Sequence, residues 1–344
     1  MPELYPLLLL PEFHERPWGA RDLAPIYDKR VGDGDGEPIG EAWLTGDACR
    51  SANGPLRGRT LGDLAKEFGA QLTGSAAPVP GRFPLLIKFL FPREKLSVQV
   101  HPDDEGARRI GQPSGKTECW YVLAAEPGAQ VGLGLKPGTT RDDLRRAIAE
   151  KRAEALLNWL DVHAGDMIYV EAGTVHAIGP GSILVETQQN SDTTYRLYDY
   201  GRPRPLHVEE GLAATKEKTH AGKVRRQDGS ATLISSPCFR VEQRKLGRGD
   251  AWAPPASAGD SPLGVSPQIL VALEGGARLE APGHEPVAFS RGEAVVVPAS
   301  VREFVVHPQW QIELLAMSLP AEKTAQPETY LYEGKSDDVK AVTT

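Results

Sequence analysis

The chain has 344 residues, 40% hydrophobic and 25% charged, with a net charge of −7 at pH 7. This composition is typical of a globular protein with one large or two smaller domains, and the acidic balance argues against general binding to nucleic acids or membrane surfaces. No run of about 18 apolar residues exists, so no membrane-spanning helix is expected. Three scattered cysteines, Cys49, Cys119 and Cys238, indicate reduced thiols and a cytoplasmic protein.

The first predicted elements are short. The N-terminal apolar stretch lacks a basic start and contains Pro6 and Pro11, so it is not expected to be a signal peptide. Residues 60–68 predict a helix that Thr60 caps, with Asp63 near its positive end. Residues 83–90 are nearly all apolar and predict a buried strand. Lys88 interrupts this strand, and it either extends to an edge or points into a polar site.

The middle of the chain predicts many strands and one helix. A helix is expected from Thr140 to about Asn158, because Thr140 and Asp143 have the spacing of a cap and its partner. A second, short helix is expected at Val208–Ala214, inside a polar segment, residues 201–232, that is predicted to connect two halves. The predicted strands of this region are residues 95–101, 118–124, 159–163, 166–170, 175–179 and 182–188.

Strand patterns resume at Thr232, and a weak internal repeat links the two halves. Residues 165–176 resemble residues 292–303: each has glycine and an acidic residue, a strand, a turn and a second strand. His176 aligns with Glu303, so the second copy is expected to lack the metal ligands described below. The sequence predicts two related antiparallel β domains, each a barrel or double-sheet jelly roll.

A group of nitrogen and oxygen donors marks a candidate metal site. The strand ending at His101 alternates apolar and polar residues, which places Ser97, Gln99 and His101 on one face. Glu118 and His176 lie on other predicted strands. Two histidines, a glutamate and a glutamine suit zinc or a similar divalent ion with an open position for substrate. The alternative is a set of buried polar residues that satisfy one another's hydrogen bonds.

Basic residues near this group matter because an anionic substrate would need them. The candidates are Lys88, Lys116, Arg196 and Arg202. Arg196 lies in a mixed aromatic and charged stretch that is either a solvated strand edge or part of the site. An arginine fork there can bind a phosphate or stabilise a developing oxyanion.

Together, several motifs resemble the type I phosphomannose isomerases, in their shorter bacterial form, within the cupin superfamily. The resemblance covers about the first 215 residues and becomes fainter beyond them. The motifs that carry it are Pro17-Trp18-Gly19, Ile39-Gly40-Glu41-Ala42-Trp43, Lys88 to Asp104, residues 115–123, Pro137-Gly138-Thr139-Thr140, residues 172–179 and residues 188–196.

The resemblance implies roles for individual residues. It assigns one Zn²⁺ to Gln99, His101, Glu118 and His176, the set already chosen from its chemistry. It implies that Arg196 is catalytic, and our hypothesis is that Lys116 or Glu186, or a group associated with the metal, moves the protons. The implied residues of the substrate site are Lys88, Lys116, Ser97 and Glu186, with Arg202 at a further basic position that would help to bind phosphate. Our hypothesis adds Asp192 to the substrate-binding residues, where it would orient Arg196. The chain has no room for the large helical insertion of the long forms.

The resemblance also implies the fold and the reaction. We expect a mainly β protein of two cupin-like jelly-roll domains with a few helices in the first: a catalytic domain at 1–215, a degenerate one at 232–320 and a polar tail at 321–344. The implied reaction interconverts mannose 6-phosphate and fructose 6-phosphate through a cis-enediol. Alternatives are a metal cupin that acts on another sugar or sugar phosphate, and a non-catalytic sugar-binding cupin. Monomer and homodimer both stay open.

Overall fold

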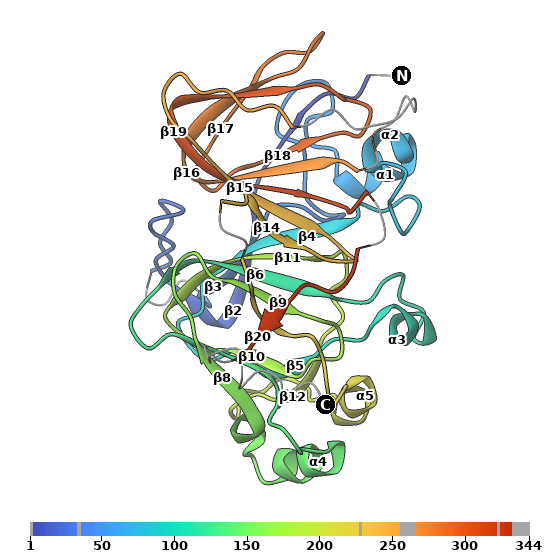
Figure 1. Cartoon of the computed structure of the whole chain (residues 1–344), viewed down its shortest axis with the longest axis vertical. Helices are drawn as coiled ribbons and strands as arrows, with labels where there is room; N and C mark the ends of the chain where they lie inside the picture. Colours follow the sequence, from blue (N-terminus) through green and yellow to red (C-terminus); the bar gives the residue numbers. More distant parts are fainter. Residues whose placement is uncertain are drawn as a thin grey trace. The chain divides into compact units, whose positions relative to one another are not determined.

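The structure is a computed structural model that describes residues 3–32, 36–226, 229–254, 264, 266–321 and 324–331. The chain divides into two compact units. Unit 1 comprises Met1–Glu15, Arg21–Phe89 and Arg226–Gln326, and unit 2 comprises Arg16–Ala20, Leu90–Arg225 and Pro327–Thr344. Both are built mainly of antiparallel strands, as the sequence predicts (Figure 1). The predicted division at 215, 232 and 320 stays a prediction, because packing units do not test it.

Unit 1 contains a sheet in which strands from both ends of its sequence pair. Its order is β1-β18-β16-β19-β15-β14, with β17 paired to β16. Buried side chains such as Leu270, Phe289 and Leu314 form its core. The elements of this unit are β1 (Leu7–Leu9), β3 (Ile39–Trp43), α1 (Leu61–Phe68), α2 (Ala70–Thr73), β4 (Leu85–Leu90, whose last residue falls in unit 2), β14 (Thr232–Ser235), β15 (Arg240–Leu246), β16 (Gln268–Glu280), β17 (Val287–Ser290), β18 (Ala294–Val297) and β19 (Val305–Ser318); β2 (Glu12–Ala20) spans the boundary between the units.

Unit 2 contains two sheets that enclose a common core. One has the order β12-β5-β10-β7-β8, and the other contains the run β11-β6-β9-β13-β20. Leu133 and Ile178 of the first sheet pack with Trp120 and Ile168 of the second. The elements are β5 (Val98–Val100), α3 (Asp104–Arg109), β6 (Glu118–Ala125), β7 (Gln130–Leu135), α4 (Arg141–Ala149), η1 (Ala153–Leu156), β8 (Leu157–Asp161), β9 (Met167–Val170), β10 (His176–Ile178), β11 (Ser182–Gln189), β12 (Tyr195–Tyr198), α5 (Val208–Ala214), β13 (Gly222–Val224) and β20 (Thr329–Tyr330).

The helices show where local sequence decides structure and where it does not. Thr60 caps α1 through the amide of Asp63, and α5 spans the predicted Val208–Ala214. The helix predicted from Thr140 to about Asn158 is wrong in its second half. Thr140 and Asp143 do form a capping box, but α4 ends at Ala149, and Leu157 begins strand β8. Pairing of β8 with β7 provides the backbone hydrogen bonds of this segment, so its apolar residues belong to a strand and not to a helix.

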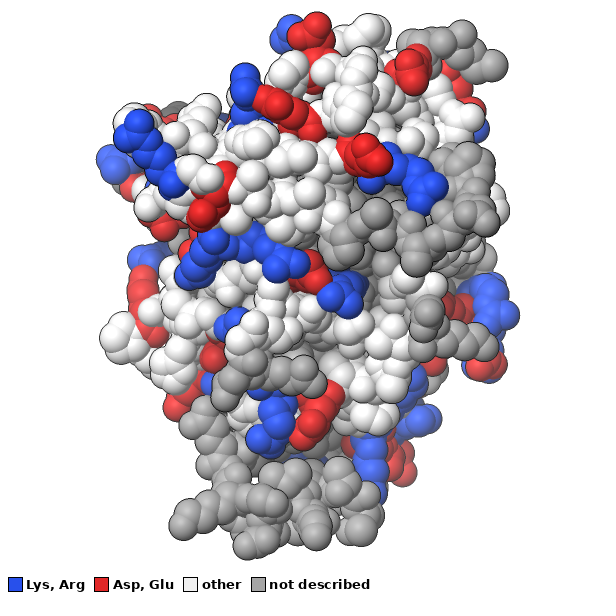
Figure 2. Space-filling view, turned by 45° about the horizontal axis from the view of Figure 1, so that its top comes forward, with Lys and Arg blue, Asp and Glu red and all other residues white. Residues whose placement is uncertain are grey.

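The surface agrees with the modest net charge of the sequence. On the face that Figure 2 presents, lysines and arginines are interspersed with aspartates and glutamates. Elsewhere among the described residues, exposed ion pairs include Arg93 with Glu126 and Arg145 with Glu209. No helix in the described part of the chain is long and apolar enough to cross a membrane.

Candidate metal centre and active site

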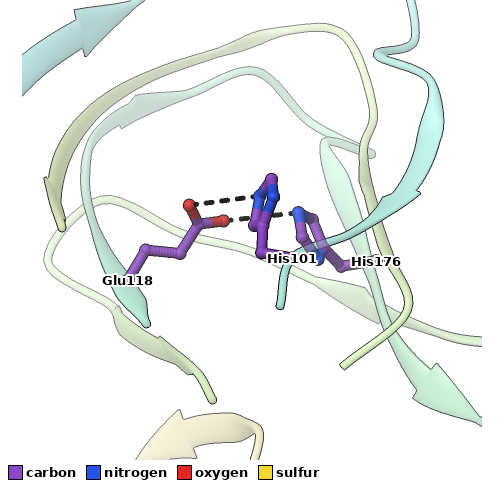
Figure 3. A group of neighbouring side chains, drawn as sticks. All are labelled: His101, Glu118 and His176. Carbon is purple, nitrogen blue, oxygen red and sulfur yellow. Dashed lines mark ion pairs between the residues drawn. The ribbon is translucent and has the colours of Figure 1, made fainter. Parts of the chain in front are cut away.

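Three predicted ligands converge inside unit 2. The ligand atoms of His101, Glu118 and His176 all lie within 4.8 Å of one another. Nε2 of His101 is 3.5 Å from Glu118 Oε2, and Nε2 of His176 is 3.3 Å from Glu118 Oε1 (Figure 3). Each side chain is only 1% exposed, so the group is enclosed by protein.

Strand pairing explains this convergence. His176 of β10 lies directly opposite Gln99 of β5, and directly opposed residues of antiparallel strands project from the same face. His101 follows Gln99 by two positions and continues that face. Glu118 begins β6 in the other sheet of the unit. Residues 75 positions apart in the chain therefore meet between the two sheets only because of the register.

Hydrogen bonds fix the orientation of both imidazole rings. Nδ1 of His101 lies 3.0 Å from the carbonyl oxygen of Thr193, and Nδ1 of His176 lies 2.9 Å from that of Thr174. A carbonyl oxygen only accepts, so each Nδ1 carries the proton and each Nε2 turns a lone pair toward Glu118. Burial lowers the pKa of His101 to about 3, with Lys116 adding to the effect, and burial also lowers the pKa of His176. Both rings are thus neutral near pH 7, the form that binds metals.

The ammonium of Lys116 lies against two of these residues, Glu118 and His101. Nζ of Lys116 is 2.9 Å from Glu118 Oε2 and 3.0 Å from His101 Nε2, and its side chain is 5% exposed. Burial acts to lower the pKa of Lys116, but Glu118 and Glu186 outweigh it, and the net pKa is raised. Burial acts to raise the pKa of Glu118, but Lys116 and His101 hold it well below its usual value. The carboxylate and the ammonium are both charged.

These residues fit a divalent metal ion. Both oxygens of Glu118 are buried and accept no hydrogen bond of good geometry, although ion pairs surround them. Buried acceptors without such donors are rare in proteins, and a bound ion is one of the groups that can satisfy them. Gln99 lies beside this group: its amide nitrogen is 3.2 Å from His176 Nε2, and its oxygen accepts a hydrogen bond from Ser97 Oγ at 3.0 Å. Its role as a metal ligand stays a prediction. Two imidazoles, a carboxylate and an amide oxygen suit zinc with an open position.

Comparison with known proteins identifies the family. A family model described as the catalytic domain of type I phosphomannose isomerase matches residues 7–123. A curated mannose-6-phosphate isomerase from Streptococcus mutans is 33% identical over 314 residues, which cover 87% of this chain and 94% of that protein. One from Bacillus subtilis is 34% identical, with coverages of 87% and 95%. The chain belongs to the type I phosphomannose isomerase family.

A solved structure agrees with this membership. The crystal structure of mannose 6-phosphate isomerase from Bacillus subtilis superposes with a TM-score of 0.75 at 30% identity and covers 92% of this chain and 99% of that one. The predicted mainly β, cupin-like fold is therefore confirmed. In the present chain, the motifs around Gln99, His101 and Glu118 lie within residues 7–123, the region that the family model matches.

Glu186 lies in the same interior as the predicted metal ligands. It sits opposite Trp120 in the pairing of β11 with β6, and Trp120 is two residues after Glu118, so all three project from one face. Its Oε1 accepts a hydrogen bond from Trp120 Nε1 at 3.0 Å, and the residue is 4% exposed. Ser97 is also buried, and it contacts the set through Gln99.

Arg196 shares a sheet face with Gln99, which it opposes in the pairing of β12 with β5. Strand β12 is the edge of its sheet, and the register places Arg196 on the same side as the predicted metal ligands. Its guanidinium donates to the carbonyl oxygen of Pro205 at 3.0 Å, and its Nε is buried without a hydrogen-bond partner. Burial lowers its pKa, with Arg204 as the next cause. Asp192 is exposed, and its proposed orienting role stays a prediction.

Two further basic residues have other partners. Arg202 donates to Asp199 at 3.1 Å, to Glu94 at 3.0 Å and to the carbonyl oxygen of Lys95 at 2.8 Å, which occupies most of its donors. Lys88 belongs to unit 1, is 3% exposed, and lies 3.7 Å from Glu41 and 4.7 Å from the ring centroid of Trp43. Roles in substrate binding stay predictions for both.

Sequence reasoning did not find the groups that orient the histidines. The acceptors at Thr193 and Thr174 are backbone carbonyls, which every residue type carries, so no pattern of residue types can reveal them. Thr174 stands inside a motif that the sequence analysis used, but its own contribution is its carbonyl.

Proposed function

We propose that this chain is a zinc-dependent isomerase that interconverts mannose 6-phosphate and fructose 6-phosphate through a cis-enediol. The observation that carries the proposal is the buried convergence of His101, Glu118 and His176, with both Nε2 lone pairs directed inward. Family membership supports the sugar phosphate as substrate, because the curated relatives are named for mannose 6-phosphate.

Gln99, His101, Glu118 and His176 would hold the zinc ion. When bound, zinc supplies a Lewis acid that polarises the sugar carbonyl and stabilises negative charge on the neighbouring oxygens. The residues of the chain supply the remaining requirements, which are to orient the sugar, to move a proton between C2 and C1, and to neutralise the enediolate.

Charge assigns different tasks to the polar residues of this interior. Lys116 is held protonated by Glu118 and Glu186, which suits it to donate a hydrogen bond to a developing enediolate oxygen. Glu186 is the carboxylate on the same face that is not a proposed metal ligand, which suits it to accept a proton. Arg196 adds a second positive charge from the β12 edge and stabilises the same enediolate.

A coupled assay from mannose 6-phosphate to fructose 6-phosphate, with and without chelator and alongside metal analysis, tests the function. We expect turnover that chelation abolishes and zinc restores. Activity on unphosphorylated mannose alone would favour a different metal cupin, and binding without turnover would favour a sugar-binding protein. Turnover that a chelator leaves unchanged, in protein shown to be metal-free, would exclude the metal.

The role of Arg196 is tested by Arg196→Ala. We expect turnover to fall at least about 100-fold, because a preorganised cation near the developing charge is lost, while zinc content stays at the wild-type level. Arg109→Ala is the control, since Arg109 is exposed and pairs with Glu105 within α3. Near-normal turnover in Arg196→Ala would remove the assignment.

A further inference from the structure

The loop after β5, which begins with His101, and the loop that leads into His176 are hydrogen-bonded to each other, and Lys216, outside both loops, binds to this connection. The amide of Gly173 donates to the carbonyl oxygen of His101 at 2.9 Å, and the amide of Lys216 donates to the carbonyl oxygen of Gly173, also at 2.9 Å. Gly173 lies three residues before His176. A continuous backbone connection therefore runs from the end of α5, through Gly173, to His101.

The side chain of Lys216 reinforces this connection. Its methylene stem covers Gly173 so closely that a Cβ there would come within 2.7 Å of Lys216 Cγ and Cδ, and Gly173 has φ +93°. Its ammonium lies 3.2 Å from Asp103 Oδ2 and 3.7 Å from Glu171 Oε1. Asp103 follows His101 by two residues, and Glu171 precedes His176 by five, so the ammonium joins both loops.

The two carboxylates are fixed from their other sides. Asp103 caps helix α3 by accepting from the amide of Gly106 at 2.9 Å. Glu171 Oε2 accepts from the amide of His220 at 2.9 Å and lies 3.0 Å from His220 Nδ1. Lys216 thus links two carboxylates that are already held in place by other hydrogen bonds. Because both carboxylates are fixed, the ion pairs with Lys216 can set the distance between the segments that carry His101 and His176.

We propose that Lys216 is a positioning residue of the metal centre, whose ammonium holds the His101 and His176 loops at the separation that metal binding requires. The proposal rests on the proposed metal site. Lys216 touches none of the proposed ligand side chains among its described contacts and acts through the backbone and the two acidic residues. Its side chain is 38% exposed, so loss of its ion pairs is expected to leave folding intact.

The test compares Lys216→Met, which keeps the stem and loses the charge, with Lys216→Arg, which keeps the charge. Lys245→Met is the matched control, because Lys245 is an exposed lysine in unit 1 that pairs with Glu313. Zinc affinity is measured by competition with a chromophoric chelator, and ligand geometry is followed by the visible absorption of the Co²⁺-loaded protein. Thermal unfolding of each metal-free variant reports any general loss of stability.

We expect Lys216→Met to weaken zinc binding about tenfold and to alter the Co²⁺ spectrum, as loss of a group that orients metal ligands does. Lys216→Arg should recover most of the affinity, and the metal-free unfolding temperature should not change. Wild-type affinity in Lys216→Met, or a weakened affinity that follows only a fall in metal-free stability, would overturn the role of Lys216. Wild-type protein that binds no zinc would instead overturn the proposed function, and the positioning role with it.

Discussion

Replacing Glu118 by glutamine tests the electrostatics of the centre without the metal. In the wild type the Glu118 carboxylate is 1% exposed and lies 2.9 Å from Nζ of Lys116, whose side chain is 5% exposed. Glutamine has nearly the same shape, so Glu118→Gln removes the negative charge while the packing is retained. Lys116 then keeps its charge in an interior where Glu186 and, more weakly, Asp192 are the remaining carboxylates that act on it.

The expected loss of stability is large. Coulomb's law at a separation of 2.9 Å gives an attraction of about 6 kcal/mol when the effective dielectric constant is ~20. Part of this is offset because the charges no longer have to be desolvated together, and removal of one partner of a buried ion pair costs about 3–5 kcal/mol. We therefore expect metal-free Glu118→Gln to lose about 3–5 kcal/mol of unfolding free energy.

The assay is urea unfolding in the presence of chelator for four proteins: wild type, Glu118→Gln, Lys116→Met and the double variant. The double variant should be much closer to wild type than the sum of the two single losses, because neither charge is left unpaired. A loss below about 1 kcal/mol in Glu118→Gln, or strict additivity in the double variant, would refute this account of the centre.

Two further predictions concern the buried cysteines and the cap of α4. Cys49 is fully buried, and burial raises its pKa to about 12, while burial raises the pKa of Cys119 well above its usual value. Raised folded-state pKa values keep both thiols protonated at pH 8, so Ellman's reagent should modify one thiol per native chain, Cys238, and three in denaturant; rapid reaction of all three in native protein would contradict this. Thr140→Ala removes the capping box of α4 and should cost about 1 kcal/mol in urea unfolding, and an unchanged midpoint would show that the cap contributes nothing.

Local chemistry made much of the fold predictable. The period of two between Gln99 and His101, and the cap formed by Thr60 ahead of α1, are readable over a few residues. The helix predicted beyond α4 was wrong because a contact distant in the sequence, and not local chemistry, decides the structure there. Leu157 fits an apolar helix stripe equally well, but its position opposite Leu135 in the β7–β8 pair decides for a strand. Helix α3 was not predicted, although Asp103 provides its N-cap.

Pairing between distant segments lay beyond local patterns. Leu7 of β1 pairs with Val296 of β18, and Lys223 of β13 pairs with Tyr330 of β20. In each case a short apolar or polar run is compatible with several partners, and the choice depends on the packing of a whole unit.

The sequence by itself determined which atoms are available to the metal centre, because imidazole, carboxylate and amide groups at Gln99, His101, Glu118 and His176 are properties of residue type. Only the tertiary structure decided how they are used. The carbonyls that orient the two rings, the placement of Lys116 among the ligands, and the link through Lys216 all arise where backbone segments far apart in the chain come together. A backbone carbonyl is the same in every residue, so its position in space, not its identity, carries that information.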